Sequence, residues 1–268
     1  MPRRAAPSLA LGLALLLSGC AGLIGGKESV PTTDASRPAQ PGPGNLPGQG
    51  SLIVQKGRPG YVIGAPHGTT DTATDLIGIE LARRTGFGAA VATGFGKLDA
   101  EGRRYNVNRP TESVAGAPPR SETETDGARR VFEAYGRSVT EASQGPLRLY
   151  VEVHGNAHQD TAGRLEIATV GLSKEDAWQV KTLLELVRDS YLRGQPETPR
   201  LEILVEPVDT LRYSASASKS GGVLGRSDKA LHVELPKVAR ATSRDAYTAI
   251  LGDFLVQWAD LLATARGR

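Results

Sequence analysis

From residue 51 onward the chain alternates short apolar segments with longer amphipathic ones, and this alternation limits the possible folds more than any other feature. Several short segments are almost wholly apolar, which is typical of strands covered on both faces of a sheet. Strands are expected at 52–54, 61–65, 89–93, 147–153, 165–170, 201–205 and 231–235. Helices are expected between them, at 72–85, 123–142, 174–192 and 243–265. The pattern predicts a three-layer α/β domain around a central, mostly parallel or mixed sheet.

The expected helices carry apolar residues at helical spacing, which are most simply explained as core. The last helix has the broadest apolar stripe, formed by Ile250, Leu251, Phe254, Leu255, Trp258, Leu261 and Leu262. Ser173 followed three residues later by Asp176 predicts a side-chain cap at the start of the third helix.

The N-terminus has the order of a bacterial export signal. Arg3 and Arg4 precede an apolar run at 9–17, which is too short to cross a bilayer. The tetrapeptide LSGC that follows resembles the lipobox of bacterial lipoproteins. That resemblance implies cleavage before Cys20, so that residues 1–19 are a signal peptide and Cys20 becomes the acylated first residue. The alternative is an ordinary signal peptide whose cysteine is accidental.

A lipid on Cys20 would anchor the protein to a membrane of the cell envelope, and Ala21 suits sorting to the outer membrane, on its periplasmic side. Residues 20–50 are rich in Pro, Gly and small polar residues, so we expect a disordered tether there and a folded domain at 51–268. The net charge of only +3 gives no support for nucleic-acid binding. With Cys20 as the single cysteine, an intramolecular disulfide is excluded.

Polar residues follow the ends of two expected strands. His67 comes just after the strand at 61–65, and His154 ends the strand at 147–153. Because ligands bind at the carboxyl ends of strands in such sheets, we expect these side chains to converge. Two histidines and a carboxylate leave a fourth position open on a hydrolytic zinc. The carboxylate is Asp71 or Asp75, although Asp71 could instead be a helix N-cap and His67 a plain loop residue.

Glu234 interrupts an apolar strand, where an ionised carboxylate is costly without a partner or a purpose. It is either a general base for water or the partner of Arg240 or Arg109. The segment RRYNVNRP contributes cations and amides that suit contact with a substrate carboxylate, although a solvated basic loop is the simpler alternative.

Four segments in order, APHGTTDTATD, YNVNRP, YVEVHGN and LHVELP, resemble the N-formylglutamate amidohydrolase family. They are more distantly similar to zinc carboxypeptidases and to the poly-γ-glutamate hydrolases that share their fold. The resemblance spans about residues 61–240 and implies a zinc-carboxypeptidase-like fold. It also implies a zinc ion held by His67, Asp71 and His154, with Glu234 as the catalytic glutamate.

The same resemblance implies substrate contacts from the basic segment. Asn108 and Arg109 match the pair that holds a substrate carboxylate, and Arg104 is the expected oxyanion partner. Two departures stand out: Thr70 lies where carboxypeptidases place a ligating glutamate, and Glu152 lies where the family has an aspartate.

Together these features predict a membrane-anchored, zinc-dependent hydrolase of amide bonds near a carboxylate. N-formylglutamate, γ-glutamyl compounds and peptidoglycan peptides are the candidate substrates, and the envelope location favours the last. The alternative is a lipoprotein that kept the fold as a non-catalytic binding or scaffold module, which Thr70 favours. The Gly- and Ser-rich run at 213–228 is either a lid or a flexible connection.

Overall fold

The computed structural model describes residues 46–118 and 121–265 of the 268-residue chain. The expected signal peptide, Cys20 and the tether up to residue 45 lie outside the described residues. Residues 46–50, which their composition assigns to the tether, include Leu46, which packs against a core cluster of the domain. No helix within the described ranges is long and apolar enough to span a bilayer.

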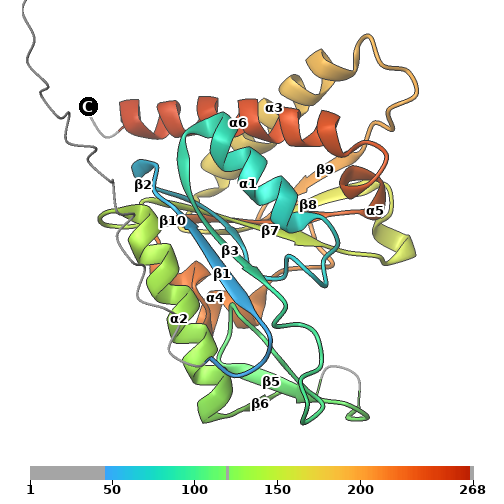
Figure 1. Cartoon of the computed structure of the whole chain (residues 1–268). Coiled ribbons are helices and arrows are strands. Elements are labelled where there is room, and N and C mark those ends of the chain that lie inside the picture. The colour runs from blue at the N-terminus through green and yellow to red at the C-terminus, as the bar shows by residue number, and fades with distance from the viewer. Residues whose placement is uncertain (1–45, 119–120, 266–268) are drawn as a thin grey trace, which may run out of the picture. The chain divides into compact units, whose positions relative to one another are not determined.

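A seven-stranded mixed sheet forms the centre of the domain (Figure 1). Its order is β1-β3-β2-β7-β10-β8-β9, in which β3, β2, β7 and β10 are parallel neighbours. The edge strand β1 is antiparallel to β3, and β8 is antiparallel to β10. The strands are β1 (Ser51–Gln55), β2 (Arg58–Ala65), β3 (Phe87–Thr93), β7 (Leu149–Gly155), β8 (Arg164–Val170), β9 (Glu202–Val205) and β10 (Lys229–Leu235).

Helices cover both faces of this sheet, which completes the three layers predicted from the sequence (Figure 1). One face packs against α1 (Thr74–Thr85), α3 (Lys174–Leu192) and α6 (Arg244–Ala265). The other face packs against α2 (Asp126–Ser143). The capping box at Ser173 and Asp176 is confirmed, since each side chain accepts a hydrogen bond from the other residue's backbone N–H.

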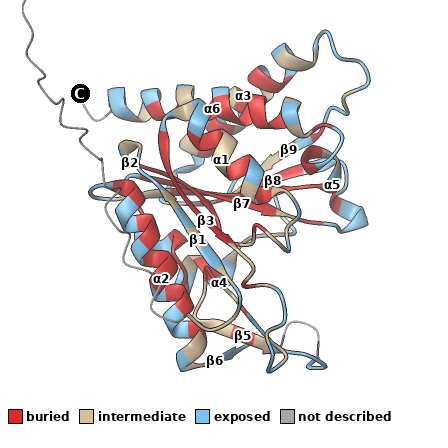
Figure 2. Cartoon of the chain, in the orientation of Figure 1, coloured by how far each residue is buried: buried red, intermediate tan, exposed pale blue. Residues whose placement is uncertain are grey.

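The alternation of side chains along the strands explains the two cores. Val151 and Val153 of β7 belong to the cluster under α1, α3 and α6, which also buries Trp258. Tyr150 of β7 and Ala230 of β10 face the opposite way, into the cluster under α2. Figure 2 shows the central strands as the most deeply buried part of the chain.

The elements that the sequence did not predict lie around residues 103–124. A small antiparallel sheet is formed there by β4 (Arg103–Tyr105), β5 (Thr111–Val114) and β6 (Thr123–Glu124). These strands are short and polar, so they carry no hydrophobic alternation. The helix expected from residue 123 therefore begins later, after its N-cap Thr125, whose side chain accepts a hydrogen bond from Ala128 N.

Two further segments differ from expectation near the carboxyl ends of the strands. The helix expected from residue 72 begins at Thr74, after Ala73 in the left-handed conformation, so Asp71 lies in a turn and is not an N-cap. The run at 213–228 contains the short helix α4 (Ser216–Gly221) and a 3₁₀ turn at Leu224–Arg226. A second short helix, α5 (Lys237–Arg240), follows β10.

Candidate metal centre

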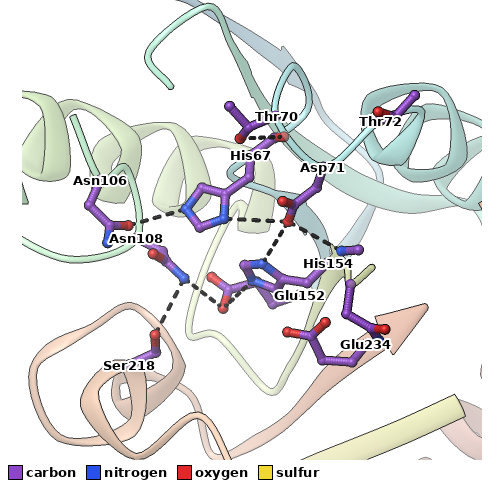
Figure 3. Close-up of polar contacts among 12 residues, drawn as sticks. His67, Thr70, Asp71, Thr72, Asn106, Asn108, Glu152, His154, Ser218 and Glu234 are labelled. Carbon is purple, nitrogen blue, oxygen red and sulfur yellow. Dashed lines mark hydrogen bonds and ion pairs between the residues drawn. The ribbon is translucent and has the colours of Figure 1, made fainter. Parts of the chain in front are cut away.

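Asp71 lies between His67, which belongs to the same turn after β2, and His154, which lies on the neighbouring parallel strand β7. The turn after β2 bends sharply, because Asp71 N donates a hydrogen bond to the His67 carbonyl at 2.8 Å. Asp71 Oδ2 is thereby 3.5 Å from His67 Nδ1 and 3.3 Å from His154 Nδ1 (Figure 3). The two imidazole rings lie with their centroids 4.9 Å apart. The backbone N–H of Gly155 donates to the same carboxylate oxygen at 3.2 Å and fixes its direction.

The spacing of these donor atoms fits a tetrahedral zinc ion. Zinc bonds of about 2.0–2.1 Å at tetrahedral angles place neighbouring ligand atoms about 3.3 Å apart. The distances of 3.5 and 3.3 Å from Asp71 Oδ2 to the two imidazole nitrogens are close to that edge length. All three donor atoms lie within 4.8 Å of one another. Imidazole nitrogen and carboxylate oxygen are also ligand types that zinc favours.

The choice between the two aspartates is clear in the geometry. Asp75 lies in the first turn of α1 and belongs to none of the candidate ligand clusters among the described residues. Thr70, at the position where carboxypeptidases carry a glutamate, bonds the His67 carbonyl and does not join the donors. The turn therefore brings Asp71, and neither Thr70 nor Asp75, to the two histidines.

The electrostatics of the cluster favour positive charge between its carboxylates. Burial would raise the pKa of Asp71, but the hydrogen bonds from His154 and His67 outweigh burial and hold that pKa well below its usual range. Burial would lower the pKa of His154, yet the Asp71 and Glu152 carboxylates raise it to about 10. The His154 ring is therefore an imidazolium beside two carboxylates when no other cation is bound.

His232 is the site residue that the sequence reasoning missed. It is buried on β10, with Nδ1 3.3 Å from Glu152 Oε2 and Nε2 3.2 Å from Glu234 Oε1. Its ring centroid lies 4.2 Å from that of His154. A signal was present, because residues two apart on a strand point to the same face, so His232 had to accompany Glu234.

Glu152 is the fully buried centre of a polar network on the α2 side of the sheet. Its carboxylate accepts hydrogen bonds from Tyr150 Oη at 3.1 Å and from Asn108 Nδ2 at 3.2 Å. Tyr150 Oη in turn lies 2.9 Å from Tyr135 Oη. Although burial would raise the pKa of Glu152, hydrogen bonds from His154 and His232 lower it, so the group is ionised.

A second possible ligand set, formed by Glu152, His154 and His232, shares His154 with the first. All three of its members are buried, and Glu152 is already engaged by Tyr150 and Asn108. In contrast, the side chains of His67 and Asp71 remain 25% and 19% exposed. The first set alone can keep a coordination position open to a substrate, so we take it as the candidate metal centre.

Glu234 borders the metal centre with one carboxylate oxygen engaged and the other without a partner. Oε1 is held by His232, and Oε2 has no hydrogen-bond partner among the described residues. The partners expected for a structural role are occupied elsewhere: Arg240 bonds the carbonyls of Thr72, Leu235 and Asn156, and Arg109 pairs with Glu122. Burial would raise the pKa of Glu234, but the His232 hydrogen bond lowers it below the usual range.

A cavity of about 460 Å³ joins these groups. Its lining includes the three candidate ligands together with Glu234, His232, Asn108 and Arg109. Residues of α4 and the preceding loop, among them Tyr213, Ser216 and Ser218, form another part of its wall. The segment proposed from sequence as a lid or a connection thus borders the cavity.

The three residues expected to contact substrate occupy different places. Asn108 is buried and donates to Glu152 and Ser218, and within the described part of the chain its Oδ1 has no hydrogen-bond partner. Arg109 lies 3.0 Å from Glu122, with its Nε buried and unpartnered among the described residues. Arg104 is exposed and lines a neighbouring cavity, so the structure does not bring it to the cavity that contains Glu234. His158, the other histidine after β7, is exposed and bonds Arg212.

Among solved structures, the chain is similar to a bacteriophage poly-γ-glutamate hydrolase, with 12% identity, 79% of this chain and 90% of that chain covered, and a TM-score of 0.47. A metallo-carboxypeptidase from Burkholderia cenocepacia has 12% identity, coverage of 82% and 67%, and a TM-score of 0.41. Murine aminoacylase 3 has 14% identity, coverage of 75% and 67%, and a TM-score of 0.35. No protein-family model matches the sequence, and a search of curated proteins returns no match. The chemistry of this chain therefore rests on its own side chains.

Proposed function

We propose that the protein is a zinc-dependent hydrolase that cleaves an amide bond next to a substrate carboxylate. The observation that carries the proposal is the meeting of two kinds of group in one cavity. Three donors that can hold a metal ion lie within 4.8 Å of one another. The same cavity is lined by Glu234, whose Oε2 has no hydrogen-bond partner among the described residues. A zinc ion, when bound, supplies a Lewis acid that polarises a carbonyl and acidifies water.

The chain's own residues account for the remaining steps. Glu234 has a lowered pKa, so it is a carboxylate at neutral pH and can take a proton from water in the cavity. His232 holds Oε1, which leaves Oε2 for that proton and for its return to the departing nitrogen. Arg109 lines the same cavity and can hold a substrate carboxylate at a fixed distance from the reacting carbonyl. Asn108 also lines the cavity, and its Oδ1 can accept a hydrogen bond from a substrate N–H, since its Nδ2 already donates to Glu152 and Ser218.

The test compares zinc content and hydrolysis in the wild type and in His67→Ala, His154→Ala and Glu234→Gln. We expect both histidine variants to lose zinc, whereas Glu234→Gln keeps zinc and loses at least about a hundredfold in kcat. Substrates are N-formylglutamate and purified peptidoglycan, of which the second is the expected one. A wild-type protein that binds zinc and hydrolyses neither would support the alternative, a non-catalytic binding module.

We further propose that an acyl chain on Cys20 anchors this hydrolase in the cell envelope, on the outer membrane and facing the periplasm. Support comes from the order of basic residues, apolar run and lipobox-like tetrapeptide. A Cys20→Ser variant should leave the membrane fraction and lose incorporation of labelled palmitate. Retention of Cys20→Ser in the outer-membrane fraction would contradict the anchor.

A further inference from the structure

A second cavity, of about 320 Å³, lies against the other side of the metal centre. It shares His67 with the first cavity, and its walls come mainly from β4, β5 and the loops that adjoin these two strands. The sequence assigned no role to this sheet. Because both cavities reach the same candidate ligand, a substrate bound at the metal centre can extend into either of them.

Hydrogen-bonded side chains run along the border between the two cavities. His67 Nε2 lies 3.1 Å from Asn106 Oδ1, and Asn106 Nδ2 donates to Glu122 Oε1 at 3.3 Å. Glu122 also accepts from Arg109 at 3.0 Å. Asn106 and Glu122 line the second cavity, whereas Arg109 lines the first. The two cavities are therefore neighbouring binding spaces on either side of this border.

The charges in the second cavity are all paired except one. Glu112 accepts from Thr125 Oγ1 and lies 3.8 Å from Arg103. Glu122 is held by Arg109, Asn106 and Thr111. The Arg104 guanidinium has only a hydrogen bond from its Nε to Ser113 Oγ at 2.9 Å, and no carboxylate of the described residues forms an ion pair with it. Its two terminal nitrogens are free to bind an anion.

We propose that Arg104 binds a second carboxylate of the substrate, on the opposite side of the scissile amide from Arg109. An arginine with both terminal nitrogens free can grip a carboxylate through two parallel hydrogen bonds. Val114, Ala117 and Pro118 in the same lining give an apolar wall for the intervening methylene groups. This assignment rests on the proposed function and replaces the oxyanion role expected for Arg104 from the sequence.

The substrate class that follows is an amide with an acid on each side, such as a γ-glutamyl peptide. A formyl group carries only a hydrogen beyond its carbonyl, so N-formylglutamate would make no use of the second cavity. The inference thus favours an acidic peptide or oligomer over a formylated amino acid.

Two matched compounds test the subsite. N-Glutarylglutamate and N-pentanoylglutamate have acyl chains of equal length and differ only in the terminal carboxylate. For the zinc-loaded wild type, we expect the glutaryl compound to have a kcat/KM about tenfold or more higher, with the difference in KM. Arg104→Ala should abolish this preference, and Arg104→Lys should restore part of it. Arg130→Ala is the control, because this arginine is exposed and lines neither cavity.

Calorimetry with zinc-loaded Glu234→Gln measures the binding of the two compounds without hydrolysis. It therefore tests the Arg104 subsite separately from the proposed catalytic activity. Tighter binding of the glutaryl compound that depends on Arg104 supports the subsite even if the wild type hydrolyses neither compound. Equal binding of the two compounds, or a preference that survives Arg104→Ala, overturns it.

Discussion

At the scale of single residues, the site is notable for charge placed inside a sheet. Glu152 is fully buried, and His232 and Glu234 are nearly so. The His232 imidazole holds the two carboxylates, because one ring nitrogen bonds Glu152 Oε2 and the other bonds Glu234 Oε1. Removing His232 would leave the buried Glu152 and Glu234 carboxylates without their shared partner. The loss in folding free energy would then be larger than the energy of the two hydrogen bonds alone.

We therefore expect His232→Leu to lower the free energy of unfolding by about 3 kcal/mol, while the zinc ligands stay in place. His158→Leu is the matched control, since that histidine is exposed, and its change should lie within about 0.5 kcal/mol. Urea unfolding at neutral pH measures both. Equal losses in the two variants would mean that the carboxylates do not depend on His232.

At the scale of elements, strands and helices could be predicted from the sequence only where apolar residues follow a regular spacing. The central strands and main helices repeat apolar residues at a clear period, and the sequence located all of them to within a few residues. The β4–β6 sheet has no such pattern, so it and the second cavity were missed. His67 and His154 were found because they follow or end expected strands, and Glu234 because an ionised carboxylate is costly within an apolar strand. His232 was missed because a neutral imidazole in the same strand carries no such cost.

One glycine in β2 illustrates how an element makes room for the site. Gly64 lies beside Glu152 on β7, and a Cβ there would stand 2.1 Å from Tyr150 Oη, which is part of the Glu152 network. Gly64→Ala should destabilise the protein by about 1–3 kcal/mol, because Tyr150 is fully buried and its hydroxyl is held by Tyr135 and Glu152. Gly163→Ala, which meets nothing within 4 Å, is the control. Equal melting temperatures for Gly64→Ala and Gly163→Ala in thermal unfolding would refute this account.

At the scale of the whole molecule, the candidate ligands tie two parallel strands together, so metal should stabilise the fold. Zinc at about a hundred times its Kd adds about 2.7 kcal/mol, which raises Tm by about 5–10 °C for a domain of this size. The pH dependence has a definite sign. The pKa of His154 is raised from 6.5 to about 10, so its contribution to metal-free stability is complete below pH 6.5 and is lost as pH rises toward 10.

Zinc needs the deprotonated imidazole, so its affinity increases over the same range. We expect the difference in Tm between zinc-loaded and EDTA-treated protein to widen from about pH 6 to about pH 9. Calorimetry at both pH values measures it, with His154→Ala as a control that shows no zinc effect. A difference that narrows with pH would contradict the assignment of His154 as a ligand.

The pairing of β7 with β10 also limits how this site can change over evolution. His154 lies opposite Glu234 and Glu152 opposite His232, so one alignment of two strands sets the positions of four polar groups. Gain or loss of a single amino acid within either strand would turn its polar pair toward the helices on the other face. A homologous protein with such an insertion or deletion would keep the seven-stranded fold and would lose the polar groups of the site in a single step.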